Sequence, residues 1–250
     1  MSKLKTKVVV VTGASKGIGA QIAKNMAAEG ASVVVNYSTS KTGADKVVEE
    51  IKSKGGSAVA VQGDLSKGAD VKRLFEETQK HYGGLDVLVN NAGVFQFDAL
   101  ETVTEDEFHR QFNTNVLGPI LATKEALPYF GNKGGSVINI SSVVSESAPA
   151  TSVVYSATKG ALDTVSRVLS KELAAKGIRV NTIAPGMVET EGTHSAGFIG
   201  SDFQKQAVSI TPLGRLGQPE DIARVAVFLA SEESQWVTGE RIQVAGGFRG

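Results

Sequence analysis

Three side chains, Ser142, Tyr155 and Lys159, have the types and the spacing of a proton-transfer site. Tyr155 and Lys159 are four residues apart, so a helix would place them one turn apart on the same face. An ammonium beside a phenol favours the phenolate, which predicts that the pKa of Tyr155 lies below its reference value of about 10. Such a phenol can exchange a proton with a carbonyl/alcohol pair. Ser142 precedes Tyr155 by thirteen residues, and its hydroxyl could donate a hydrogen bond to the substrate oxygen.

A glycine-rich segment, Thr12–Gly19, is the second feature with chemical meaning. It follows the apolar run Val8–Val11 directly and opens a predicted helix. Glycines permit a tight turn and let the backbone approach a pyrophosphate, and the helix N-terminus offers free N–H groups. No Gly-Lys-Ser/Thr follows in phosphate-loop spacing, which disfavours a nucleoside triphosphatase. The sequence therefore predicts a dinucleotide site, with contacts from Gly13, Ser15, Lys16, Gly17, Ile18 and Gly19.

Short β-branched runs alternate with longer amphipathic stretches along the whole chain. This rhythm predicts one α/β domain over residues 1–250, a Rossmann-type doubly wound parallel sheet of about seven strands with helices on both faces. Predicted strands are 8–11, 32–36, 58–61, 85–90, 136–141, 178–183 and 241–244. Predicted helices are 17–29, 44–54, 67–82, 104–129, 152–176 and 219–230.

The rhythm is interrupted between Gly186 and Gly217. Periodicity is weak there, although Asp202–Ser209 could form a short helix. A stretch of about 30 residues far exceeds an ordinary connection, which indicates a functional segment. We interpret residues 187–216 as a mobile lid over the substrate.

Composition excludes several classes of function. The chain has no cysteine, so disulfides, thiolate metal sites and cysteine nucleophiles are absent. The 26 basic and 26 acidic residues balance, which argues against a nucleic-acid or acidic-membrane partner. No signal peptide or membrane span is expected, and a cytoplasmic location is the default. The three histidines, at 81, 109 and 194, lack ligand spacing, so no metal site is predicted.

Several motifs carry a resemblance to a known family. The segment Thr12–Gly19, with the spacing Thr-Gly-x-x-x-Gly-x-Gly, resembles the signature of the short-chain dehydrogenase/reductases. The resemblance extends along essentially the whole chain through further motifs in family order: Asn90–Gly93, Asn115, Ser142, Tyr155–Lys159 and Pro185-Gly186. The subfamilies most similar to the chain are the 3-oxoacyl-carrier-protein reductases and the glucose dehydrogenase-like ketoreductases.

The resemblance implies roles for the residues of the site. Tyr155 would be the general acid in reduction, and Lys159 would also bind the nicotinamide ribose. Asn115 would hold a water that connects Lys159 to solvent, although from the sequence alone it could equally kink a helix. Ser141 competes with Ser142, but the family's interval of thirteen residues to the tyrosine selects Ser142.

Further cofactor contacts are implied in the same way. Asp64 and Leu65 resemble the adenine-binding pair, whereas the alternative for Asp64 is a helix cap or turn residue. The backbone of Asn91, Ala92 and Gly93 would pass beside the adenosine ribose. The nicotinamide would be bordered by Pro185, Gly186, Val188 and Thr190.

The end of the second strand bears on the choice between NAD and NADP. An acidic residue there binds the ribose 2′-hydroxyl and repels a 2′-phosphate, but this strand ends Asn36-Tyr37-Ser38. Lys16 could attract the phosphate and Ser38 could hydrogen-bond to it, although an arginine often found in NADP-preferring relatives is missing. We expect a preference for NADP(H), with NAD(H) possible as a second cofactor.

The expected substrate pocket is mainly apolar, with Val94, Phe95, Phe97, Val144, Met187, Phe198, Ile199 and Phe203, and His194 is one of its few polar residues. Each aromatic residue among them could instead be ordinary core packing. The composition suits a small-molecule ketone with apolar substituents, or the corresponding alcohol, better than a phosphorylated or free-acid metabolite.

We therefore expect an NAD(P)H-dependent carbonyl reductase/secondary alcohol dehydrogenase. The alternative is a 3-oxoacyl-[acyl-carrier-protein] reductase, which Arg167 and Lys171 support and the single lysine of Pro128–Lys133 weakens. A same-fold isomerase or dehydratase, or a non-catalytic NADP-binding regulator, is disfavoured by the intact Ser–Tyr–Lys set. The family implies a homotetramer.

Overall fold

The strands are short runs rich in valine and isoleucine, whose branched side chains fit a pleated sheet. The computed structural model describes residues 2–249, in which seven strands pair in parallel as one sheet in the order β3-β2-β1-β4-β5-β6-β7. From β1 the chain first builds β2 and β3 on one side of the sheet, and it then crosses to the other side of β1 to build β4 to β7. This is the topology of a doubly wound sheet and confirms the predicted fold class. The bounds are β1 (Val8–Val11), β2 (Ser32–Tyr37), β3 (Ser57–Gln62), β4 (Val87–Asn90), β5 (Gly135–Ile140), β6 (Ile178–Pro185) and β7 (Arg241–Val244).

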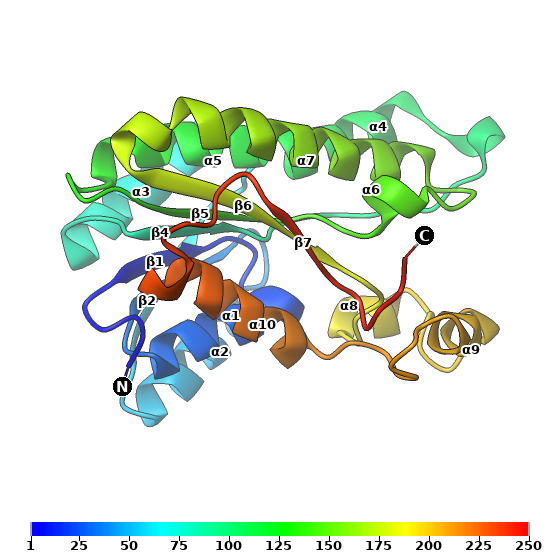
Figure 1. Cartoon of the computed structure of the whole chain (residues 1–250), viewed down its shortest axis with the longest axis horizontal. Helices are drawn as coiled ribbons and strands as arrows, with labels where there is room; N and C mark the ends of the chain where they lie inside the picture. Colours follow the sequence, from blue (N-terminus) through cyan, green and yellow to red (C-terminus); the bar gives the residue numbers. More distant parts are fainter. Residues whose placement is uncertain (1, 250) are drawn as a thin grey trace.

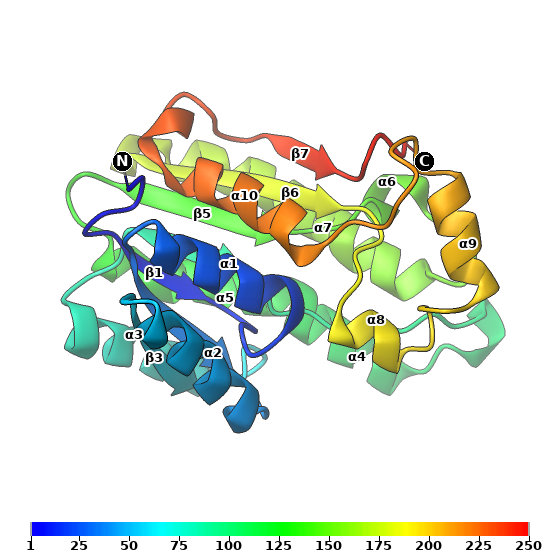
Figure 2. The same cartoon turned by 90° about the horizontal axis from the view of Figure 1, so that it is seen from below.

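Helices cover both faces of the sheet (Figures 1 and 2). One layer holds α1 (Gly17–Ala28), α2 (Lys41–Ser53) and α10 (Pro219–Ala230), and the other holds α3 (Gly68–Tyr82), α5 (Gly118–Ala126) and α7 (Val153–Glu172). Successive side chains of β1 point to opposite faces of the sheet, so this strand contributes to the core on both sides. Val9 and Val11 pack with residues of α1 and α10, whereas Val10 packs with residues of α3 and α5. Within residues 2–249 no helix is long and apolar enough to span a membrane.

The long helix predicted over 104–129 is interrupted in its middle. It consists of α4 (Glu105–Phe112), a π-helical turn at Asn113–Leu117, and α5, followed by a 3-10 turn at Leu127–Tyr129. Single π-helical turns widen a helix and re-aim its backbone, often at functional sites. Asn115 lies in this turn.

The weakly periodic stretch after β6 contains two helices. The predicted helix at α9 (Asp202–Ser209) has the expected bounds. A second helix, α8 (Glu191–Ser195), was not predicted, because five residues are too few for a periodic pattern. It is defined instead by a capping box between Thr190 and Thr193. Both helices lie at the end of the sheet where the parallel strands finish (Figures 1 and 2).

Buried amides join the centre of the sheet to α7. Asn90 on β4 donates from Nδ2 to Oδ1 of Asn139 on β5 at 2.8 Å. Asn139 in turn donates from Nδ2 to the hydroxyl of Ser166 on α7, also at 2.8 Å. Because a buried polar group without a partner is costly, these bonds fix how α7 lies on the two strands. The contact through Ser166 anchors the second half of α7 on β5.

Candidate active site

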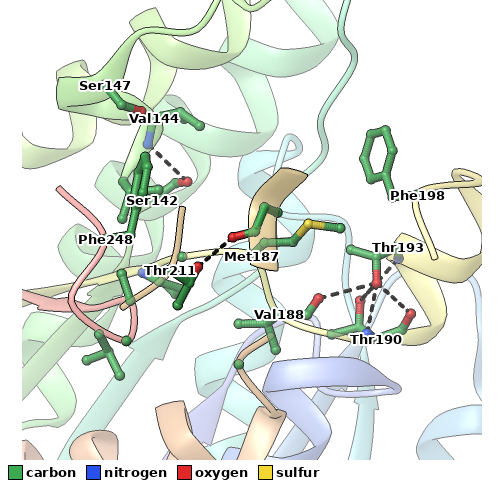
Figure 3. Close-up of a pocket in the computed structure, with 18 of the residues that line it drawn as sticks. Ser142, Val144, Ser147, Met187, Val188, Thr190, Thr193, Phe198, Thr211 and Phe248 are labelled. Carbon is green, nitrogen blue, oxygen red and sulfur yellow. Dashed lines mark hydrogen bonds between the residues drawn. The ribbon is translucent and has the colours of Figure 1, made fainter. Parts of the chain in front are cut away.

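A cavity of about 730 Å³ opens at the carboxyl ends of the central strands, where ligands bind in open α/β sheets. Ser142 at the end of β5 and Tyr155 and Lys159 on α7 all lie on its wall. Figure 3 shows Ser142 on one side of the cavity, Thr190 and Phe198 on the other, and Met187 between them. The structure therefore brings the three predicted proton-transfer residues to one cavity.

Lys159 is buried, with 5% of its surface exposed. Its Nζ donates to the backbone carbonyl of Ile140 at 3.0 Å and lies 5.7 Å from the centre of the Tyr155 ring. Burial lowers the pKa of Lys159 to about 8, while the negative charge of Asp163, one turn further along α7, raises it. The ammonium is therefore still mostly protonated at neutral pH, but it loses its proton at a much lower pH than an exposed lysine does.

Tyr155 corrects an expectation drawn from spacing. The sequence predicted a pKa below 10, but burial raises the pKa of Tyr155 to about 12, and interaction with the Ser142 side chain opposes this only in part. The reason is that Lys159 points its ammonium at the Ile140 carbonyl and lies over the ring instead of pairing with the phenol oxygen. In this environment the phenol keeps its proton at neutral pH.

The two neighbouring serines have different surroundings. The Ser141 hydroxyl is buried and donates to the backbone carbonyl of Lys159 at 3.4 Å. The Ser142 hydroxyl accepts from the backbone N–H of Val144 at 3.3 Å and interacts with the Tyr155 side chain. This difference favours Ser142 as the group that meets a substrate oxygen.

Asn115 is buried and its side chain makes three hydrogen bonds. Its Oδ1 accepts from the N–H of Val94, and its Nδ2 donates to the Val94 carbonyl and to the Thr158 hydroxyl. The amide therefore ties the segment after β4 to the π-helical turn and to α7. Both alternatives for Asn115 have a basis here, since it lies in the helix distortion and also next to the Lys159 turn of α7.

Aromatic rings surround Tyr155. Phe95 and Phe97, from the segment after β4, have ring centres 6.1 and 5.7 Å from that of Tyr155. Phe198, from the segment between α8 and α9, stacks on Phe95 at 6.2 Å, and Phe203 of α9 lies 5.1 Å from Phe198. These separations lie in the range of favourable aromatic pairs. The rings make a wall with flat, apolar surfaces beside the phenol.

The glycine turn fits a dinucleotide. Gly13 has a φ of +60°, and a Cβ there would lie 2.8 Å from the Cα of Ala92. No side chain is accommodated, so the turn lies directly against the segment after β4. Ile18, Asn91, Gly93 and Thr190 line the same cavity as Tyr155, which therefore extends from the turn to the phenol. Pro185, Gly186 and Val188, which the family resemblance places beside the nicotinamide, also lie on its wall.

Residues predicted around the adenosine end have several roles. Asn36 is fully buried; its Oδ1 accepts from the N–H of Gly13, and its Nδ2 donates to the carbonyls of Val61 and Gly63. Its side chain therefore supports the turn from within instead of facing a ligand, which corrects its expected role as a contact. Ser15 and Tyr37 are half-buried, whereas Lys16 and Ser38 are exposed.

Asp64 and Leu65 follow β3. Oδ1 of Asp64 accepts from both the N–H and the hydroxyl of Ser66, so its carboxylate organises a turn, as the alternative interpretation held. Leu65 is buried in the core beneath α3 and α5. Any contact of Leu65 with a cofactor would have to be made by its backbone.

The residues predicted for the substrate pocket lie on the cavity wall, with two exceptions, Ile199 and His194. Val94, Phe95, Phe97, Val144, Met187, Phe198 and Phe203 all line it. His194 does not: its Nε2 lies 3.0 Å from Oε1 of Glu189, and it borders a separate 300 Å³ pocket beside α1. His194 lies near the end of the short helix α8, and its side chain is exposed. Within residues 2–249 no three histidine, aspartate or glutamate side chains gather as a metal site.

Two contributions to the site were missed. The carboxylate of Glu191 on α8 accepts from the N–H of Gly17 at 3.0 Å, at the beginning of α1. The C-terminal residues Ala245, Gly246 and Phe248 line the cavity, because the chain turns back after β7 and Gly246 accepts from the N–H of Leu213. The apolar character of the last residues, from Val244 to Phe248, is the signal in the sequence that could have indicated this burial.

Comparison with known proteins agrees with this geometry. A family model described as enoyl-(acyl carrier protein) reductase matches residues 13–249. An uncharacterized oxidoreductase of Methylorubrum extorquens is 57% identical over 100% of both chains. The short chain dehydrogenase/reductase nsrJ of Aspergillus novofumigatus is 42% identical over 98% of this chain and 96% of its own. The crystal structure of the angucycline C-6 ketoreductase LanV with bound NADP has a TM-score of 0.93 and 36% identity, covering 98% of this chain and 96% of that one. The chain thus belongs to the short-chain dehydrogenase/reductase family and is an NAD(P)-dependent oxidoreductase.

Proposed function

We propose that the protein reduces ketones that carry an aryl substituent, with NADPH as reductant and Tyr155 as the general acid. The observation that carries the proposal is a protonated phenol on the wall of an aromatic-lined cavity that is continuous with the glycine turn. The relative LanV is named a ketoreductase and was solved with NADP bound, which agrees with both halves of the proposal.

The residues divide the work of reduction as follows. When bound, the nicotinamide cofactor supplies a hydride to the carbonyl carbon. The Ser142 hydroxyl donates a hydrogen bond to the carbonyl oxygen, where negative charge develops. Tyr155 transfers its proton to that oxygen, and the Lys159 ammonium stabilises the phenolate that remains. Asn115 would hold the water through which the phenolate regains a proton from solvent.

Tyr155→Phe tests the assignment of the proton donor. The ring and its packing are kept, so only the transferable proton is lost. We expect kcat for ketone reduction to fall by about 10²–10⁴-fold, the usual contribution of a general acid. Thermal unfolding should be unchanged, which serves as the control. Reduction at a rate close to that of the wild type would refute the mechanism.

The aromatic wall is the basis for the choice of substrate. The rings of Phe95, Phe97, Phe198 and Tyr155 lie within 5.7–6.2 Å of one another in five pairs, so a flat ring lying against this wall meets faces and edges. Stacking of this kind adds about 0.5–1.5 kcal/mol per ring pair beyond simple burial. An aliphatic chain gains the burial but not the stacking.

A matched pair of ketones tests this choice. We expect kcat/KM for an aryl methyl ketone to exceed that for an aliphatic methyl ketone of equal carbon number by about tenfold, and Phe198→Leu to reduce the ratio several-fold. Phe108→Leu is the control, because Phe108 lies on α4 and stacks on Phe112 away from the cavity wall. A ratio near one in the wild type would rule out the aryl preference.

The NADPH preference rests on the end of β2. That strand carries no carboxylate at its end, and the exposed side chains of Lys16 and Ser38 are able to meet a 2′-phosphate. A charge-assisted hydrogen bond to phosphate contributes about 1.5–3 kcal/mol.

Steady-state kinetics with both cofactors test the preference. We expect kcat/KM to be higher for NADPH, and Lys16→Ala to lower it for NADPH by about tenfold while leaving NADH unaffected. Lys133→Ala, which removes an exposed lysine before β5 at the other end of the sheet, is the matched control. A kcat/KM for NADH that equals or exceeds the value for NADPH would contradict the proposal.

The second candidate is reduction of an acyl chain on a carrier protein. The description of the matching family model favours it, and Arg167 and Lys171 are exposed on α7 where an acidic partner could dock. A 3-oxoacyl thioester included in the ketone assays separates the two candidates. A thioester that is turned over much faster than any aryl ketone would place the second candidate first.

We also propose that the protein is a homotetramer paired through its long helices. Apolar side chains on α5 and α7 and on the π-helical turn are exposed, namely Leu117, Ile120, Val153 and Val168. Exposed apolar patches on a helix pair are typical of interfaces.

Light scattering during size-exclusion chromatography tests the assembly. We expect four times the mass of one chain, and Val168→Asp should lower that mass because it buries a charge in the interface. A monomer at micromolar concentration would disprove the tetramer.

A further inference from the structure

We propose that Arg241 and Asp163 form a positioning pair behind the active site: the guanidinium holds the backbone of Ser142, and the carboxylate supplies a fixed negative charge one helical turn from Lys159. The inference rests on the proposed function, since it concerns the same proton-transfer residues. It gives a role to a buried ion pair that the mechanism above does not use.

The guanidinium is almost enclosed. The Arg241 side chain is 14% exposed although it lies on β7, at the edge of the sheet. Its Nε contacts Oδ2 of Asp163 at 3.1 Å, and its Nη2 donates to the Ser142 carbonyl at 3.3 Å and to the Ser145 hydroxyl at 3.1 Å. One planar group therefore joins β7, the end of β5 and α7, and the fixed fork of an arginine suits this use.

The carboxylate is even more enclosed. The Asp163 side chain is 7% exposed, and its second oxygen, Oδ1, has no hydrogen-bond partner within the described chain. A buried ion pair is a weak source of stability, because desolvation offsets its attraction. A half-satisfied carboxylate is weaker still, so stability alone is a poor explanation for its presence.

The pair acts on Lys159 through charge. Asp163 follows Lys159 by four residues on α7, and its charge opposes the burial that lowers the pKa of Lys159 to about 8. The other titratable or charged groups around Lys159 are Tyr155 on its own helix, Arg241 on β7 behind Asp163, and Glu146 of α6 (Val144–Ser147), which reaches Arg241 from its exposed side. Asp163 is therefore a buried anion one helical turn from Lys159, and its charge favours the protonated form of the Lys159 amine.

Opposite shifts of the pH profile are the signature of this role. If charged Lys159 is required, activity falls as the pH rises through the pKa of Lys159. Asp163→Asn removes a negative charge and should move this alkaline limb to lower pH by roughly one unit, the size of shift that a nearby charge produces. Arg241→Met leaves the carboxylate unopposed and should move the limb to higher pH.

Two more variants separate charge from positioning. Arg241→Lys keeps the charge, so the limb should stay in place, but it cannot hold both Asp163 and the Ser142 carbonyl, so kcat should fall several-fold. Glu146→Gln removes an exposed carboxylate on the same guanidinium and should change neither quantity.

A measurement without turnover makes the test independent of the proposed function. The pH dependence of Lys159 acetylation by trace acetic anhydride, read by mass spectrometry, should shift in the same two directions in the cofactor-free protein. Thermal unfolding and NADPH binding report whether each variant is folded. If Tyr155→Phe loses activity but Lys159 labelling is unshifted in Asp163→Asn and Arg241→Met, the reductase proposal stands and the proposed role of the Arg241–Asp163 pair is refuted.

Folding failure of a single variant does not end the test. In that case the double variant Asp163→Asn/Arg241→Met, which removes both buried charges of the pair together, replaces it. We expect its alkaline limb near that of the wild type and its kcat several-fold lower. Equal kcat in the double variant, or shifts of the same sign in the two single variants, would overturn the proposal.

Discussion

The site depends on one hydrogen bond, from the Lys159 ammonium to the backbone carbonyl of Ile140. It joins α7 to the end of β5 at the point where the sheet meets the cavity. Ser142 lies two residues beyond that carbonyl, and Tyr155 lies one turn before the lysine. The same contact therefore sets the distance between the hydrogen-bond donor and the proton donor. The Asn139–Ser166 bond deeper in the fold holds the next turns of α7 on the same strand.

Burial then decides which group carries the proton. Enclosure raises the pKa of Tyr155 to about 12 and lowers that of Lys159 to about 8, because both charged forms lose solvation. A phenol with this pKa is protonated at neutral pH, which is the form that the proposed reduction needs at its start. A charged lysine is needed afterwards, to stabilise the phenolate. Asp163 opposes the cost of keeping that charge.

Local patterns predicted most of the fold, and they selected three residues, Ser142, Tyr155 and Lys159, that the structure places on one cavity wall. Valine runs such as that of β1 are buried on both faces, and the glycine spacing after it fixes the turn, so these need only neighbouring residues. The predicted pKa of Tyr155 was wrong because burial raises it, and the spacing between Tyr155 and Lys159 reveals neither that burial nor the bond of the Lys159 ammonium to the Ile140 carbonyl. The role of Asn36 depends on the neighbouring strand β3, whose Val61 carbonyl accepts from its side chain. The position of His194 depends on α8, a helix of five residues that is too short for a periodic pattern.

The substrate side of the cavity is formed by segments that are remote in sequence. The rings of Phe95 and Phe97 follow β4, those of Phe198 and Phe203 belong to the stretch after β6, and the C-terminal residues close the wall. Their convergence at the carboxyl ends of the strands follows from the topology, whereas the shape that they enclose depends on packing. This explains why reaction type is readable from motifs and the substrate is not.

A structure of the protein with NADP and a bound aryl ketone tests the central claim most directly. The account predicts the ketone oxygen within hydrogen-bond distance of both the Tyr155 and the Ser142 hydroxyls, with the aryl ring against Phe95 or Phe198. A ketone oxygen that points away from Tyr155, toward solvent or toward another donor, would contradict it.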